Sequence, residues 1–330
     1  MRYAVRAGIP HVLMIEAWEG VTYFMRSFLI KRGVNAVLTI LVIITLTFIL
    51  MHSVPGGPFT QEKPVPPAIL ENLNKFYHLD EPVWKQYFRY VGSLLQGDLG
   101  PSYKSQSRDV NQMLKEAMPV TVQLGLQALV VAVIGGLFLG ITSSLYHNRI
   151  PDRLATILAV LGTSVPSFVI ATLLIQFLAV QFHWFPVATW ASMKHTVLPT
   201  LALSASPLAQ ITRLMRSNML EVLNQDYIKT AKAKGLPYVR VVVNHAIRNA
   251  ILPVITILGP ITAHLVTGSF VIEKIFSVPG SGKMLVDGIN NRDYSLIMGT
   301  TVVYGIALVV ILFIVDLLYS IIDPRIKLRG

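Results

Sequence analysis

"VNAVLTILVIITLTFILMHS", residues Val34 to Ser53, contains no Asp, Glu, Lys or Arg. A helix of about 20 apolar residues crosses the hydrocarbon core of a bilayer, since each residue adds about 1.5 Å. Lys31 and Arg32 precede this run, and the segment Pro55–Pro58 ("PGGP") ends it. The stretch predicts a transmembrane helix. It also sets the class of the whole chain, because similar apolar runs recur along the sequence.

The composition indicates the same class. The chain has 330 residues, of which 53% are hydrophobic and 14% charged, whereas soluble domains carry about 25% charged residues. The net charge of +11 lies at the ends of apolar runs rather than in one patch, which argues against nucleic acid as a partner. Cysteine is absent, so the chain has no disulfide framework and no thiolate chemistry. We predict an all-α polytopic protein of the lipid bilayer.

Six transmembrane helices are expected. They lie at about Val34–Ser53, Ala117–Tyr146, Leu154–Val180, His195–Thr212, Ile251–Ile272 and Tyr294–Ile321. Within the second, Gly136 and Gly140 have the spacing that lets two helices approach closely. With a cytoplasmic N-terminus, the inner segments hold 17 Lys and Arg against six Asp and Glu, whereas the first external loop is balanced. The positive-inside rule therefore places both termini in the cytoplasm.

The predicted organisation follows from these spans. Residues 1–33 form a cytoplasmic N-terminal extension, 34–116 the first helix and a long external loop, 117–322 a core of five helices, and 323–330 a cytoplasmic tail. Apolar residues at helical spacing predict a short helix at Pro66–Leu79 that caps the outer mouth. The core contains a basic cytoplasmic loop at about 221–253.

No enzyme or metal site is predicted. "PGSGKM" (Pro279–Met284) fails the phosphate-loop pattern twice, because Ser277 replaces its first Gly and Met284 its metal-binding hydroxyl. We interpret Gly280 and Gly282 as turn residues. The histidines lack metal-ligand spacing, and Ser164 and Ser167 have no evident base. We expect no catalytic, cofactor-binding or metal-binding residue in this chain.

Three polar residues of the spans are candidates for a translocation path or for helix packing: His264, Thr267 and Asp316. Ionisable residues within a membrane are costly and often functional. The alternative for His264 is packing with a satisfied hydrogen bond. For Asp316, it is a hydrogen bond between helices near the cytoplasmic interface.

The basic loop contains "DYIKTAKAKGLPYVRVVVNHAIRNAILP", Asp226 to Pro253. We expect Asp226 to cap a short helix that ends at Gly235, and Pro237 to begin a second helix to about Asn249. That second helix would have an apolar side formed by Val239, Val242, Val243, Ala246 and Ile247. The small residues at the corner would let the groove of another protein close around it. The alternative role of the lysines is attraction to anionic lipid.

These residues carry a resemblance. The loop resembles the cytoplasmic loop of ABC-importer permeases of the type I fold, in the version of the dipeptide, oligopeptide and nickel permeases. Lys229-Thr230-Ala231 stand where the family motif has Glu-Ala-Ala. "LMHSVPGGPF", "GDLGPSYK", "GSFVIEKIFSVPGSG" and "VDLLYSIIDPRIKL" are similar to stretches of oligopeptide permeases of the B type, especially those of Gram-positive bacteria, in the same order. The resemblance spans about Met25 to Arg329, and residues 1–24 receive no function.

The resemblance implies a transport subunit rather than an enzyme. Its partners would be a second, homologous permease, two cytoplasmic ATPases that bind the ATP and Mg, and an extracellular protein that delivers the peptide. The ATPase-coupling residues would be Asp226, Tyr227, Thr230, Ala231, Ala233, Lys234, Gly235 and Leu236. The same fold also imports dipeptides, nickel or other small solutes. A stand-alone carrier or channel would show internal inverted repeats with buried charges, and neither is evident.

Overall fold

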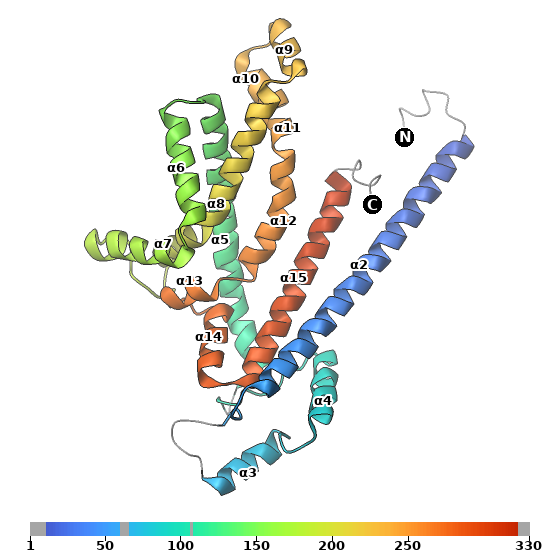
Figure 1. The fold of residues 1–330 in the computed structure, drawn as a ribbon, viewed down its shortest axis with the longest axis vertical. Coiled ribbons are helices and arrows are strands. Elements are labelled where there is room, and N and C mark those ends of the chain that lie inside the picture. Colours follow the sequence, from blue (N-terminus) through green and yellow to red (C-terminus); the bar gives the residue numbers. More distant parts are fainter. Residues whose placement is uncertain (1–10, 60–65, 106–107, 323–330) are drawn as a thin grey trace.

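The computed structural model describes residues 11–59, 66–105 and 108–322, and within them every regular element is a helix (Figure 1). In chain order these are α2 (His11–Ser53), α3 (Pro67–Phe76), α4 (Val83–Leu95), α5 (Val110–Leu145), α6 (Ile150–Ser164), α7 (Ser167–Leu174), the π-helix η1 (Ile175–Gln181), α8 (Met193–Leu223), α9 (Asp226–Ala233), α10 (Tyr238–Arg240), the π-helix η2 (Val241–Ile247), α11 (Arg248–Ala250), α12 (Leu252–Val266), α13 (Phe270–Ile275), α14 (Ser281–Asn291) and α15 (Tyr294–Ile322). The predicted all-α class is confirmed.

The described residues contain four helical stretches that are long and apolar enough to span a membrane. They are Ile30–Ser53 in α2, Val110–Leu145 (α5), Leu252–Ile275 (α12 with α13) and Tyr294–Val315 in α15. A fifth is added if α6 and the segment Ser167–Gln181 are counted as one broken span. Four of the six predicted spans thus correspond to these stretches.

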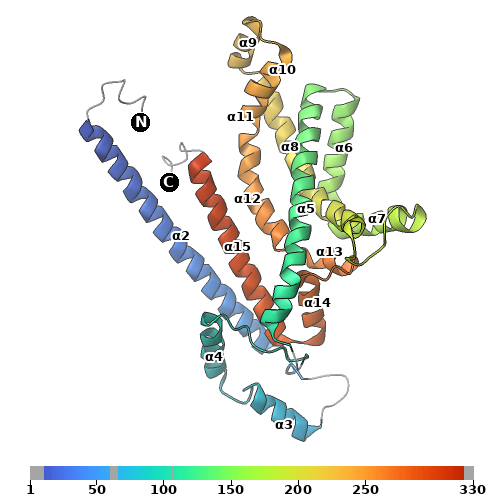
Figure 2. The same ribbon diagram turned by 180° about the vertical axis from the view of Figure 1, so that it is seen from behind.

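The span predicted at about Leu154–Val180 corresponds to α6 and the segment Ser167–Gln181, which meet at a sharp break and do not form one straight helix. The chain bends by 112° between α6 and α7, and α7 points away from the bundle (Figures 1 and 2). Val165 has φ −91° and ψ 124°, the extended backbone that a residue before proline prefers. Pro166 then begins a new helical direction, because its nitrogen cannot donate to the preceding turn.

Helix α8 covers the predicted fourth span as one longer helix that packs along α5 and α6. It is less apolar than the four stretches above and is not among them. A Cβ at Gly136 of α5 would lie 2.7 Å from Ile211, and one at Gly140 would lie 2.7 Å from Met215. The two glycines therefore let α5 and α8 meet closely, as their spacing predicts.

Different helices lie at the two ends of the molecule. The N-terminal end of α2, the C-terminal end of α15 and the α9–α10 hairpin lie at one end, and α3, α4 and α14 lie at the other (Figure 1). Helix α3 confirms the helix predicted at Pro66–Leu79, whereas α4 was not predicted. Both helices belong to the segment between α2 and α5.

At the α9 end, Asp152 joins three helices. Its carboxylate is 5% exposed and accepts hydrogen bonds from Arg216 Nε (2.7 Å) and from the second Arg216 guanidinium nitrogen (2.9 Å). Ser143 Oγ donates to the same carboxylate at 2.5 Å, and the Asn148 backbone N–H at 2.8 Å. The network ties the ends of α5 and α6 to α8.

We expect Arg216→Ala to lower the free energy of unfolding by about 3 to 5 kcal/mol, because it leaves the Asp152 carboxylate buried without its cation. The measurement is thermal unfolding of the purified chain in detergent. Arg213→Ala is the matched control, since Arg213 lies on the same helix and is exposed. Equal midpoints for the two variants would contradict the assigned role.

Candidate functional site

The corner between α9 and α10 is built by a glycine in the left-handed backbone conformation. Gly235 has φ +76°. Its N–H donates to the Lys232 carbonyl at 3.0 Å, and the Leu236 N–H donates to the Ala231 carbonyl at 3.4 Å. These two bonds form the Schellman motif, which ends a helix and needs a residue without a side chain at its left-handed position. The predicted role of Gly235 as the end of the first helix is confirmed.

Helix α9 is seated on the rest of the chain by one face. Ile228 is 0% and Ala231 7% exposed, and both belong to the main hydrophobic core with Val241 and Val242. Leu236 is partly buried against the same core. Ala231 thus faces its own protein, not outward, and its small size lets α9 lie close to η2. The burial of Ala231 comes from its position one turn after Ile228.

The predicted cap is wrong in detail. Gln225 precedes the helix as its N-cap, without a side-chain hydrogen bond, and Asp226 is the first helical residue. The Asp226 carboxylate instead pairs with Lys229 Nζ at 2.9 Å on an exposed surface. Such a pair contributes little to stability. An acidic residue in the first turn still interacts favourably with the helix dipole.

The second helix of the loop also differs from the prediction. It runs from Tyr238 through the π-helix η2 and α11 to Ala250. Its buried residues are Val241, Val242, Ala246 and Ala250. Val239 and Val243 were predicted on the apolar side but are 71% and 52% exposed. A π-helix closes each turn with an extra residue, so a side assigned at 3.6 residues per turn is displaced along it.

The outward surface of the hairpin carries the remaining predicted residues. Asp226, Tyr227, Thr230, Ala233, Lys234 and Gly235 are all exposed there. Sequence reasoning missed Tyr238, which is 56% exposed just beyond the corner. Tyr227, Tyr238 and Val239 leave apolar side chains exposed on the α9–α10 hairpin, which lies at the tip of the molecule (Figure 1). Tyrosine is enriched at protein interfaces.

The candidate path residues separate in the structure. His264 lines a cavity of about 500 Å³ at the α6–α7 break, together with Ser164, Ser167 and Gln210. Thr267 is absent from this lining, and its Oγ1 donates to the carbonyls of Ala263 (2.9 Å) and His264 (3.1 Å). Both bonds lie within its own helix. Asp316 lies in α15, but its side chain is outside the described residues.

The side chains that line this cavity carry hydroxyl, amide, imidazole and apolar groups, without Asp, Glu, Lys or Arg. The cavity lies between α6, α7, α8 and α12, and its lining includes Pro166 at the α6–α7 break, Pro207 of α8 and Pro260 of α12. Among the described residues, no group of three or more His, Asp or Glu has the arrangement of a metal site. The cavity can therefore offer neutral hydrogen bonds to a solute.

A buried carboxylate that sequence reasoning missed lies near the cavity. Glu273 is 0% exposed and accepts hydrogen bonds from Thr121 Oγ1 (3.0 Å), Gly282 N (2.8 Å) and Lys283 N (3.1 Å). The backbone N–H groups at the N-terminus of α14 thus donate to the carboxyl group of Glu273. A Cβ at Gly282 would lie 2.9 Å from Glu273 Oε2. Gly280, the N-cap of α14, and Gly282 leave room for this carboxyl group, and Gly282 lies within the helix and not in the predicted turn.

The bundle of apolar helices, with four stretches long enough to span a membrane, indicates a multi-pass membrane protein. The chain belongs to the family of binding-protein-dependent transport system inner membrane components, which matches residues 132–328. The N-terminal membrane component of such systems matches residues 25–125. The predicted bacterial membrane location is confirmed.

Named relatives cover nearly the whole chain. The dipeptide transport system permease protein DppB of Bacillus subtilis (strain 168) is 54% identical over 92% of this chain and 99% of its own length. The oligopeptide transport system permease protein OppB of Haemophilus influenzae is 42% identical over 92% of this chain and 100% of its own. The predicted permease branch is confirmed.

Two solved structures share the fold. An amino acid ABC transporter crystallised with histidines has a TM-score of 0.52 at 15% identity, covering 63% of this chain and 92% of that chain. The inward-facing MetNI methionine ABC transporter has a TM-score of 0.51 at 16% identity, covering 66% and 97%. At these identities the likeness shows the permease fold alone.

Proposed function

We propose that this chain is one of two homologous permease subunits of an ABC importer for oligopeptides. Two ATPases on the cytoplasmic side bind ATP and Mg, and an extracellular binding protein delivers the peptide. The chain itself carries no catalytic group for ATP. The names of the relatives support a peptide as the substrate.

The exposed Gly235 corner is the observation that carries this proposal. It lies at the tip of the molecule, and α9 is anchored below it through Ile228 and Ala231. A force applied to the corner is therefore transmitted to η2 and to the core. Docking in an ATPase groove would let closure of the ATPases move these helices. The proposal includes six membrane crossings with both termini on the cytoplasmic side, since the ends of α2 and α15 share the end that carries α9.

Co-purification tests the proposal. Tagged chain is expected to bring down a second permease and two ATPases, and peptide loaded on the binding protein should raise ATP hydrolysis by the reconstituted complex. Dipeptides, longer peptides and Ni²⁺ compared in the same assay distinguish the substrate alternatives. Uptake by the chain without ATPases would overturn the proposal in favour of a secondary carrier.

We further propose that the cavity beside His264 belongs to the peptide path. Its hydroxyl, amide and imidazole groups would bond to peptide main chain. Gln210→Leu with His264→Leu is expected to lower uptake at least tenfold, since two polar groups of the lining are lost. The measurement is uptake of a labelled peptide, with co-purification of partners as the folding control.

Thr256→Val is the matched control, because Thr256 is an exposed residue of α12 outside the cavity lining. Full uptake by the double variant would remove the cavity from the path. Equal loss in the control variant would show a general defect of α12 instead.

A further inference from the structure

Helix α4 contacts the outer part of the span in α2, well below its end. Tyr87 Oη lies 2.8 Å from Thr45 Oγ1, and Gln86 Oε1 lies 3.0 Å from His52 Nε2. At 1.5 Å per residue, Thr45 lies about 12 Å along the helix axis from Ser53, where the span ends. Helix α4 therefore reaches the depth of the outer leaflet and does not lie wholly above the membrane.

The direction of α4 fits this depth. It rises from α3 alongside α2, so that its C-terminal end is the deeper one (Figures 1 and 2). Its charged residues are Lys85 near its start and Arg89 at its middle, and both pair with Glu81, at 3.2 Å and 2.7 Å. The second half contains none. Charges near the water and an uncharged deeper end are the arrangement that a bilayer requires.

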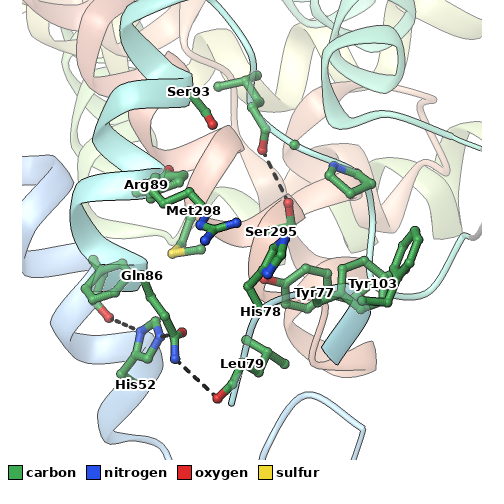
Figure 3. A pocket seen from close by; sticks show the side chains of 16 residues that line it. His52, Tyr77, His78, Leu79, Gln86, Arg89, Ser93, Tyr103, Ser295 and Met298 are labelled. Atoms are coloured by element: carbon green, nitrogen blue, oxygen red, sulfur yellow. Dashed lines mark hydrogen bonds between the residues drawn. The ribbon is translucent and has the colours of Figure 1, made fainter. Parts of the chain in front are cut away.

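The two sides of α4 differ in polarity. Gln86, Arg89 and Ser93 line a cavity of about 180 Å³ between α4, α2 and α15 (Figure 3). The other side presents Trp84, Phe88 and Leu95, which are 65%, 67% and 85% exposed. At 100° per residue these three lie within one narrow sector of the helix.

The exposed side continues an apolar surface of the span. At the same level, Leu46 and Leu50 of α2 are 55% and 62% exposed. Tryptophan is enriched where a membrane meets water, and Trp84 lies at the shallow end of α4. An amphipathic helix with an aromatic and aliphatic face lies in this zone of a bilayer.

We propose that α4 is a re-entrant helix in the outer leaflet, and that its Trp84–Phe88–Leu95 face binds lipid acyl chains. The external segment between α2 and α5 is then anchored to the membrane at this helix. Polar groups on its other side keep contact with α2 through His52 and Thr45. This inference does not depend on the transported solute.

The absence of cysteine from the chain makes a direct test straightforward. The variants Phe88→Cys and Leu95→Cys each carry one nitroxide label. Each labelled chain is co-purified with its partner subunits and reconstituted in phosphatidylcholine vesicles. We expect high accessibility to O₂ and low accessibility to nickel(II) ethylenediaminediacetate at both positions. The lipid control is Leu38, an exposed residue of the α2 span, and the water control is Lys75 on α3.

Two results would overturn the proposal. Nickel accessibility at residues 88 and 95 equal to that at residue 75 would place α4 in water. Immobile labels reached by neither reagent would show that another protein, such as a second permease, covers the face. A second measurement needs no cysteines. Brominated phosphatidylcholine should quench the tryptophan fluorescence of the unmodified chain more strongly than that of the Trp84→Phe variant. Equal quenching of the two would also contradict lipid contact.

Discussion

Gly235→Pro is expected to abolish ATP-driven uptake, at least a hundredfold below the unmodified chain, while membrane insertion remains normal. Gly235 has φ +76°, and proline fixes φ near −65°. The substitution also removes the N–H that donates to the Lys232 carbonyl. The corner is exposed, and a Cβ there would meet nothing within 4 Å. The loss would therefore come from backbone direction rather than from crowding.

Gly235→Ala supplies a graded comparison. Alanine costs about 1 to 2 kcal/mol in the left-handed conformation but keeps the N–H. We expect partial uptake from this variant. Uptake is measured with labelled peptide, and insertion by the amount of chain in washed membranes. Normal transport by the proline variant would contradict the coupling role of the corner.

If the basic loop serves instead to attract anionic lipid, different substitutions are expected to reduce uptake. Replacing Lys229, Lys232 and Lys234 by glutamine would then lower function, whereas a coupling role expects a smaller effect than Gly235→Pro. Substitutions of Ala231 and Ala233 distinguish a loss of α9 packing from a loss of partner binding. Ala231→Asp should loosen α9 from its own core, because Ala231 is buried, while Ala233→Asp should affect only partner binding. Co-purification of ATPases by detergent-stable chain distinguishes them.

Glu273→Ala is expected to lower the free energy of unfolding by about 3 kcal/mol or more, because it leaves buried donors without an acceptor. Those donors are Thr121 Oγ1 and the backbone N–H groups of Gly282 and Lys283. Ser281 extends the network, since its Oγ lies 3.0 Å from Thr121 Oγ1 and accepts a hydrogen bond from Tyr304 Oη at 3.0 Å. Removal of the carboxylate should thus loosen α5, α13, α14 and α15 together.

Thermal unfolding in detergent measures this effect, which should appear as a midpoint lower by several degrees. Lys283→Ala is the control, because Lys283 contributes its backbone N–H and its side chain makes no bond to Glu273. Gly282→Ala should resemble Glu273→Ala, since the added Cβ meets the carboxylate. An unchanged midpoint for Glu273→Ala would show that the network does not stabilise the fold.

Local patterns account for the features that the sequence predicted correctly. Apolar runs without charge identify helices that can enter a bilayer, and four of the predicted spans appear as such stretches. Gly235 between a short helix and Leu-Pro is typical of a left-handed helix end. Gly136 and Gly140 indicate a close helix contact wherever their partner lies. Each of these follows from residues near one another in the chain.

The sequence-based predictions failed where contacts between distant residues, or a helix with another period, determine the local structure. The length of the uncharged stretch before Lys194 predicts a span but not the 112° bend at Val165 and Pro166. The exposed Val243 lies in a π-helix, whose turns a period of 3.6 does not describe. Helix α4 was missed because its apolar face is mixed with polar residues that bind α2.

By itself, the sequence determined that this protein is a helical membrane protein with a glycine corner in a basic loop, and the resemblance of its motifs implied a permease. Hydropathy and backbone preference are properties of short segments, and they need no partner to be expressed. The tertiary structure alone decided that Ala231 faces inward, that Glu273 occupies the N-terminus of α14, and that α4 lies beside α2. Burial and hydrogen bonding join residues that are far apart in the chain, so only the packed molecule shows which groups meet.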